Sequence, residues 1–97
     1  MEYLRVRWIH TVPDDPVILY SELDGERWEL RKVEVYADGR EDYADGKAQS
    51  GSTLLGTVPV PTLDEIAAQP EFEPALITAE EFETVWQSAR SKHRGSL

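Results

Sequence analysis

The sequence predicts an α+β fold, in which an antiparallel four- to five-stranded meander sheet carries a C-terminal helix and a short preceding helix packed on one face. Three observations lead to this class. The first half alternates apolar and polar residues and is divided by Asp-Gly pairs. The second half contains two helix-start signals. The last apolar stripe repeats at helical spacing, and the sheet is the only large surface that could cover it.

The first strand is expected over residues 3–10, YLRVRWIH, in which apolar and charged side chains alternate. The stretch TVPDDP, residues 11–16, ends it, because proline cannot donate to a sheet ladder and aspartate favours turns. A second strand follows over residues 17–23, VILYSEL, which is rich in β-branched and aromatic side chains. These strands predict the start of a meander.

A third strand is expected over residues 27–37, RWELRKVEVYA. The preceding Asp24-Gly25 pair is typical of a two-residue hairpin turn of type I′. Along the strand, the apolar residues change phase between Leu30 and Val33. One extra residue near Arg31-Lys32 would reconcile the phases, so the sequence predicts a β-bulge or strong bend there; the alternative is that both faces are partly covered.

The remaining sheet residues follow in short pieces. Asp38-Gly39 predicts another hairpin turn, and residues 40–44, REDYA, a short fourth strand that Asp45-Gly46 ends. Residues 47–52 are a polar loop, and residues 53–58, TLLGTV, are the candidate fifth strand.

Two capping boxes predict the helices. Thr62 and Glu65 have capping-box spacing in residues 61–70, a short helix that ends at Pro70, and residues 71–74 read as a linker. A second box opens the C-terminal helix, expected over about residues 79–91. On this helix the apolar residues fall at i, i+3, i+4 and i+7, which makes one stripe: Phe82, Val85, Trp86 and Ala89.

The charge of the chain is strongly acidic, with ten Lys and Arg against nineteen Asp and Glu and a net charge of −9. Residues 88–97 hold three basic side chains and no acid, so residues 1–87 carry a net −12. We therefore expect one α+β domain over residues 1–87 and a basic, flexible C-terminal tail over residues 88–97. A body this acidic repels phosphate backbones, which excludes nucleic acid as the expected partner.

Cysteine is absent, which excludes disulfides, thiolate zinc sites and cysteine nucleophiles. No apolar run reaches the roughly 18 residues of a membrane span, and the N-terminus lacks the apolar segment of a signal peptide. The expected protein is cytoplasmic and makes no membrane contact. The sequence leaves its oligomeric state open.

The stretch ADGREDYADG, residues 37–46, is the densest acidic segment between the strands. The calcium-loop pattern D-x-[DN]-x-[DN]-G-x₅-E is not met, since Arg40 occupies a ligand position. Asp38 and Asp42 could still converge across a hairpin, but turn chemistry is the better interpretation. We expect no metal and no cofactor.

His10 is the only histidine before the C-terminal segment. A histidine paired with Asp14 or Asp15 could act as a general base, but one histidine at a strand end is more often a structural hydrogen-bonder. The motifs of serine hydrolases, P-loops, dinucleotide sites and zinc proteases are absent. The three tryptophans read as core residues, and no catalytic residue is expected.

Several stretches together resemble a known family. They include residues 13–16 (PDDP) with 20–22 (YSE), then 31–34 (RKVE), then 59–65 (PVPTLDE). The chain resembles a bacterial family of small proteins classed as a domain of unknown function, number 6881, from about residue 3 to about residue 87. The resemblance implies a stand-alone bacterial cytoplasmic domain. It implies no catalytic or binding residues.

The expected function is that of a non-enzymatic, acidic protein-interaction domain. A specific form is an immunity- or antitoxin-like protein whose acidic face masks a basic partner such as a nuclease toxin, because opposite charge speeds association. The candidate partner-binding residues are all acidic: Asp14, Asp15, Glu22, Asp38, Asp42, Glu80 and Glu81.

Two alternatives belong to other classes. One is a small-molecule-binding protein or enzyme with a pocket between sheet and helix around His10, Tyr20 and the tryptophans. The other is an accessory subunit whose exposed sheet edge pairs with a strand of a partner. A concave site holding His10 or converging carboxylates would favour an enzyme, whereas a flat acidic or apolar patch would favour an interaction domain.

Overall fold

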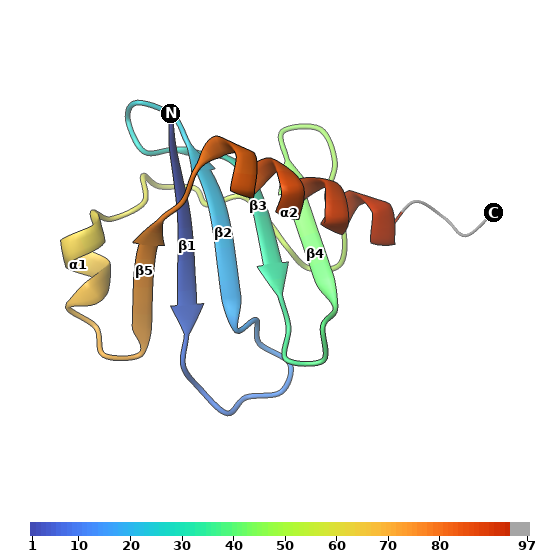
Figure 1. Cartoon of the computed structure of the whole chain (residues 1–97), viewed down its shortest axis with the longest axis horizontal. Helices are drawn as coiled ribbons and strands as arrows, with labels where there is room; N and C mark the ends of the chain where they lie inside the picture. The colour runs from blue at the N-terminus through green and yellow to red at the C-terminus, as the bar shows by residue number, and fades with distance from the viewer. Residues whose placement is uncertain (94–97) are drawn as a thin grey trace.

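A computed structural model describes residues 1–93 of the chain. Five antiparallel strands form one open sheet in the order β4-β3-β2-β1-β5. One helix precedes β5 and another follows it (Figure 1). This confirms the α+β class and the antiparallel meander of the first four strands. The elements are β1 (Glu2–Trp8), β2 (Ile18–Leu23), β3 (Glu29–Val35), β4 (Glu41–Asp45), α1 (Leu63–Ala67), β5 (Phe72–Leu76) and α2 (Ala79–Lys92).

The fifth strand is not where the sequence predicted it. Residues 53–58 form no strand. Three of the four residues interpreted as a linker, residues 72–74, belong instead to β5, which pairs with β1. Ile77 N–H donates to Tyr3 O and Ile9 N–H to Glu71 O, so the hydrogen-bonded positions of β5 are the odd-numbered ones. Pro74 therefore lies at a position whose nitrogen faces away from β1. A proline is tolerated there because the free edge requires no donor.

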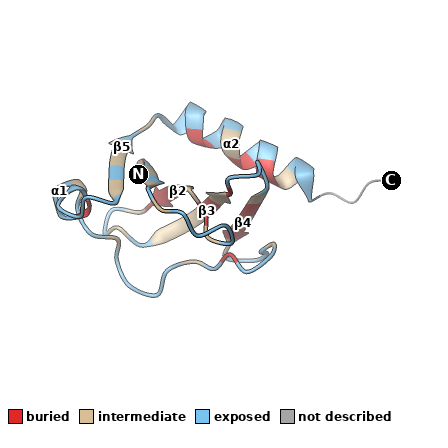
Figure 2. Ribbon diagram, turned by 90° about the horizontal axis from the view of Figure 1, so that it is seen from below, coloured by how far each residue is buried: buried red, intermediate tan, exposed pale blue. Residues whose placement is uncertain are grey.

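Helix α2 covers one face of the sheet, as its apolar stripe predicted (Figure 2). Val33 of β3 packs with Phe82, Trp86 and Ala89 of α2 in a buried cluster. Aromatic side chains from three strands border this cluster: Tyr3, Tyr20 and Tyr43. Trp86 is only 4% exposed, so the stripe is the main contact of the helix with the sheet.

The opposite face has its own smaller core. Leu4 and Leu23 pack there with Ile66 of α1, bordered by Val60 and Phe72. The short helix thus lies on the face opposite α2, whereas we expected both helices on one face. Side chains alternate along β1, so Tyr3 points toward α2 and Leu4 points to the opposite face. Both faces of the sheet therefore carry apolar side chains that need cover.

The hairpins use a longer turn than the two-residue type I′ predicted for Asp24-Gly25. In the first hairpin Arg27 N–H donates to Asp24 O, and Arg27 has a positive φ of 69°. In the second, Gly39 N–H donates to Tyr36 O, and Gly39 has a φ of 88°. Both are three-residue loops that end in a left-handed residue. Arginine thus occupies in one hairpin the position that glycine occupies in the other.

The predicted irregularity in the third strand is confirmed. Arg31 pairs with Glu22, and Glu29 with Leu23, so Leu30 is the extra residue of a β-bulge. This bulge rotates the strand between its two apolar phases. Val33 of the second phase packs under α2, whereas Trp28 of the first phase is 39% exposed and does not belong to the core, contrary to its interpretation as a core residue.

The proposed C-terminal tail is shorter than expected. Residues 88–92 belong to α2, and Ala89 is fully buried in the core cluster. The 87/88 boundary is therefore wrong, because the helix stripe continues across it. The rest of the tail, residues 94–97, lies outside the described residues. None of the described helices is both long enough and apolar enough to cross a membrane.

Burial of Ala89 gives a direct test of where the domain ends. Ala89→Gln should lower the free energy of unfolding by about 2 kcal/mol, because it overfills the core and buries an amide. Ser91→Gln, on the exposed side of the same helical segment, should change it by less than about 0.5 kcal/mol. Urea unfolding followed by circular dichroism measures both. Equal, small effects would show that residues 88–92 do not pack on the sheet.

Candidate functional site

The seven acidic candidates do not form one surface. Asp14, Asp15 and Asp38 lie in the β1–β2 and β3–β4 connections at one end of the sheet (Figure 1). Glu80 and Glu81 lie in the first turn of α2 at the other end (Figure 1). The remaining two candidates, Glu22 and Asp42, are buried, with 8% and 6% of their surface exposed.

Glu22 belongs to an ion pair between the sheet and α2. Arg31 donates from Nε and Nη2 to the two carboxylate oxygens of Glu22, each at 2.8 Å, from the neighbouring strand. The same guanidinium reaches Glu83 of α2, with 2.9 Å between Nη2 and Oε2. Its carbon lies 5.0 Å from the ring centre of Phe82 and 5.1 Å from that of Trp86. Glu22 is thus occupied within the fold and presents no charge to a partner.

The electrostatics of this pair follow from its hydrogen bonds. The bonds from Arg31 hold the pKa of Glu22 below its ordinary value, although burial acts in the opposite direction. The Glu22 carboxylate in turn raises the pKa of Arg31. Hydrogen bonds from Arg31 also lower the pKa of Glu83. All three groups are therefore charged at neutral pH, in an arrangement that neutralises the guanidinium from two sides.

The carboxylate of Asp42 contacts both the loop after β4 and the C-terminal end of α2. Its Oδ1 accepts a hydrogen bond of 3.0 Å from Ser50 Oγ and lies 3.2 Å from His93 Nε2. Gly51 has a φ of 55°, and a Cβ there would lie 2.6 Å from Asp42 Oδ2. A serine, an aspartate and a histidine meet here, but Ser50 and His93 each contact the carboxylate of Asp42 and no contact joins the serine to the histidine. The arrangement therefore lacks the nucleophile–base contact of a catalytic triad.

The two Asp-Gly pairs of the acidic stretch 37–46 form turns on either side of β4, as interpreted. Asp38 Oδ1 accepts from Arg40 N–H, and Asp45 Oδ1 accepts from the N–H groups of Lys47 and Ala48. The two backbone hydrogen bonds lower the pKa of Asp45. Within residues 1–93, no group of three or more histidine and carboxylate side chains is placed to hold a metal ion.

His10 is a structural hydrogen-bonder. Its Nδ1 accepts from Val12 N–H at 2.9 Å, so Nε2 carries the proton and donates to Pro16 O at 2.8 Å. Its ring packs edge-on against Trp8, with 4.4 Å between ring centres. Both nitrogens therefore close the β1–β2 connection, and the hollow that Tyr20 lines with Ile18 and Glu73 does not include His10.

An apolar groove that the sequence analysis did not predict lies on the face opposite α2. Its volume is about 240 Å³. Leu4, Val6 and Leu19 of β1 and β2 form its floor, and Pro61, Ile66 and Phe72 form its sides. The structure thus does place a hollow between sheet and helix, but beside α1 and away from His10.

The groove ends in a polar cluster of Ser21, Glu29 and Lys32. Glu29 accepts from Ser21 Oγ at 2.8 Å and from Gly56 N–H at 2.6 Å. Lys32 Nζ lies 3.4 Å from Glu29 Oε1 and donates to Leu54 O. The sequence did carry a signal for this cluster. Lys32 points to the face of the sheet opposite Val33. A charged residue on a face that other parts of the chain cover indicates a buried polar site.

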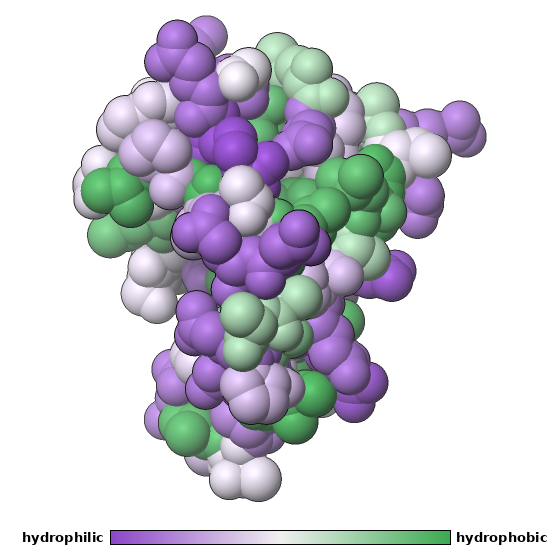
Figure 3. Space-filling model, turned by 90° about the vertical axis from the view of Figure 1, so that its left-hand side faces the viewer, coloured by the Kyte–Doolittle hydropathy of each residue, from purple (hydrophilic) through white to green (hydrophobic). Residues whose placement is uncertain are grey.

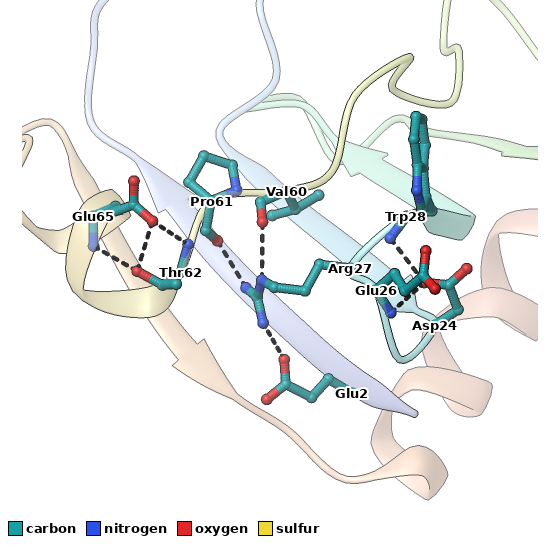
Figure 4. A network of polar contacts seen from close by, with 9 residues as sticks. All are labelled: Glu2, Asp24, Glu26, Arg27, Trp28, Val60, Pro61, Thr62 and Glu65. Atoms are coloured by element: carbon teal, nitrogen blue, oxygen red, sulfur yellow. Dashed lines mark hydrogen bonds and ion pairs between the residues drawn. The ribbon is translucent and has the colours of Figure 1, made fainter.

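Arg27 fixes the side of the groove that contains Val60 and Pro61. This side chain donates to Val60 O at 2.9 Å and to Pro61 O at 2.7 Å, and it pairs with Glu2 (Figure 4). Its own backbone carbonyl accepts from Val60 N–H. The capping box of Thr62 and Glu65, predicted from the sequence, then fixes the start of α1.

Comparison with protein families identifies one match. The model of the family described as a domain of unknown function, DUF6881, matches residues 2–91, nearly the whole chain. The chain belongs to this family. The DUF6881 match extends past residue 87, in agreement with the continuation of α2 to Lys92. Comparisons with curated proteins and with solved structures gave no match.

The ion pair of Glu22 and Arg31 should make the free energy of unfolding depend on pH in the acidic range. Because the pKa of Glu22 is lower in the folded than in the unfolded chain, the pair stabilises the fold fully above the unfolded pKa of about 4.3. That stabilisation is lost as the pH falls through the lower folded pKa. Glu22→Gln should therefore lower the free energy of unfolding by about 2 kcal/mol at pH 7, and by progressively less below about pH 4.

Urea unfolding of both proteins between pH 7 and pH 2.5 measures this difference. Glu73→Gln is the matched control, since the Arg7–Glu73 pair is more than half exposed and should contribute less than about 0.5 kcal/mol. A difference between wild type and Glu22→Gln that stays constant down to the lowest pH would contradict the account.

Proposed function

We propose that this DUF6881 protein is a non-enzymatic interaction domain that binds a basic protein partner through acidic side chains. In its specific form it is an immunity- or antitoxin-like protein of the bacterial cytoplasm that masks a basic partner such as a nuclease toxin. The observation that carries the proposal is a group of acidic side chains at one end of the sheet that are exposed or partly exposed and belong to no ion pair among the described residues.

This end is where β2 leads to β3 and where α2 begins (Figure 1). It carries the α2-start surface, which we define as Asp24, Glu26, Glu80 and Glu81. None of the ion pairs among residues 1–93 involves these four side chains. The neighbouring arginines are occupied, because Arg27 pairs with Glu2 and Arg31 with Glu22 and Glu83. The carboxylates of this surface are thus left without an ion pair of their own among the described residues.

The backbone presents these acids on rigid elements. Asp24 Oδ1 accepts from Glu26 N–H and Trp28 N–H and fixes the hairpin loop. Glu81 closes the capping box with Thr78 at the start of α2. Side chains on fixed backbone lose less entropy on binding, so the surface suits rapid electrostatic docking.

Two features favour surface docking over pairing of a partner strand with the sheet. Pro74 removes a donor from the free edge of β5. The outer edge of β4 is covered by its own loop, since Asp45 N–H donates to Ala48 O and Ser50 N–H to Tyr43 O.

On the side that carries α1 and β5, hydrophobic residues form separate groups divided by hydrophilic ones (Figure 3). That side therefore offers no continuous apolar face.

The proposal predicts a salt-dependent association. The partner is captured from the native host, identified and purified, and its association rate is measured by stopped flow. The rate should fall about tenfold or more between low salt and 0.15 M, because salt screens the field over a Debye length of about 8 Å. The protein should not retard duplex DNA at physiological salt, since a duplex carries one negative charge per roughly 1.7 Å.

Two variants locate the contact. Glu80→Gln/Glu81→Gln should slow association severalfold while leaving the fold intact, because glutamine also closes a capping box. Asp14→Asn/Asp15→Asn removes equal charge from the other end of the sheet and should have a smaller effect. An acidic partner, a rate that ignores salt, or equal effects of the two variants would refute the proposed contact.

A further inference from the structure

We propose that the groove opposite α2 binds a small neutral organic molecule with an apolar body and a hydroxyl or carboxamide head. The site lies on a different part of the molecule from the α2-start surface, and the proposal stands independently of any protein partner. It rests on the shape of the groove, on the fixed position of its sides and on the charge balance of its polar end.

The apolar part of the groove sets the size and character of the ligand. Its floor of Leu4, Val6 and Leu19 and its sides of Pro61, Ile66 and Phe72 offer almost only carbon. The volume of about 240 Å³ lies just below the range of roughly 300–1,000 Å³ found for ordinary ligand pockets. The body of the ligand is therefore about the size of a single substituted ring or a short branched chain.

The sides of the groove are held apart before any ligand arrives. Residues 60 and 61 cannot collapse onto the floor, because Arg27 holds both carbonyls from the β2–β3 hairpin (Figure 4). Phe72 on the other side is fixed by pairing with Trp8 across β5 and β1, with 5.9 Å between ring centres. Binding would therefore need little ordering of the protein, which favours affinity for a small molecule.

The polar end specifies a neutral head. The side chains of Glu29 and Lys32 are 5% and 17% exposed, and they neutralise each other. A charged head group would add a third charge to the Glu29–Lys32 pair. One of the three charges would then lack a partner at a poorly hydrated site, and burying an unpaired charge is unfavourable. A neutral head leaves the existing pair intact.

The same cluster leaves both a donor and an acceptor for the ligand. Lys32 Nζ has three N–H groups, of which the described contacts with Glu29 and Leu54 O occupy two. Ser21 Oγ donates to Glu29, and its lone pairs receive no hydrogen bond from residues 1–93. A hydroxyl or carboxamide group can donate to Ser21 and accept from Lys32 at once, whereas a carboxylate can only accept.

The experiment is a titration of the ¹⁵N-labelled protein with benzyl alcohol, benzamide, toluene and benzoate, followed by amide chemical shifts. Benzyl alcohol and benzamide should shift the amides of Ser21, Lys32, Gly56 and Gln69. They should bind about two- to tenfold more tightly than toluene, the range expected for one net hydrogen bond. Benzoate should bind more weakly than benzyl alcohol.

Matched variants separate the apolar and polar parts of the site. Val6→Phe fills the groove and should weaken all four probes at least about tenfold, whereas Val58→Phe, at an exposed position outside the groove, should change nothing. Gln69→Trp closes the groove from the exposed turn after α1 and gives the same test without altering the floor. Ser21→Ala should reduce the preference for benzyl alcohol over toluene, because only the hydrogen bond from Lys32 remains, and it should leave toluene binding unchanged.

The outcomes are decisive in both directions. Absence of shifts at the groove, or equal binding to wild type and to both groove-filling variants when each variant retains its amide spectrum, overturns the site. Toluene binding as tightly as benzyl alcohol to the wild type overturns the assignment of the polar end. Benzoate binding most tightly overturns the neutral head.

Discussion

The guanidinium of Arg31 joins two neighbouring strands of the sheet to α2, whose Glu83 lies 52 residues further along the chain. It bonds both oxygens of Glu22 on the next strand, reaches Glu83 on α2 and lies against the rings of Phe82 and Trp86. The Leu30 bulge beside it determines which way the side chain points. An arginine suits this position because its planar fork can bond a carboxylate in two places while its faces contact aromatic rings. Removing it would leave Glu22 buried and without its partner.

This arrangement makes the two faces of the sheet different. Under α2, charge is neutralised within the fold and aromatic side chains fill the space, so that face serves stability. On the opposite face, a five-residue helix and a long connection cover the strands incompletely and leave the groove beside Leu4 and Val6. Small domains have few residues with which to cover a second face. The two proposals rest on what remains outside these cores, namely the polar pair at the end of that groove and the acids in no ion pair at one end of the sheet.

The sequence was informative where the signal is local. Alternation located the first four strands, both capping boxes lie where their spacing placed them, and the Trp86 stripe indicated the contact of α2. The sequence was not informative where an element depends on a contact with residues far away in the chain. Strand β5 contains Pro74 and Glu73 and is preceded by Glu71, and its partner β1 lies 66 residues away, so its own residues read as a linker. Glu22 and Asp42 looked like exposed acids, because burial depends on Arg31, Ser50 and His93, which no local pattern connects to them.

A double-mutant cycle on Glu22 and Arg31 tests the central claim most directly. The free energies of unfolding of wild type, Glu22→Gln, Arg31→Met and the double variant are measured by urea unfolding at pH 7, beside the same cycle on the exposed pair Arg7 and Glu73. The account predicts a coupling energy of about 2 kcal/mol for the first pair and less than about 0.5 kcal/mol for the second. A coupling at Glu22 and Arg31 no larger than that of the exposed pair would contradict it.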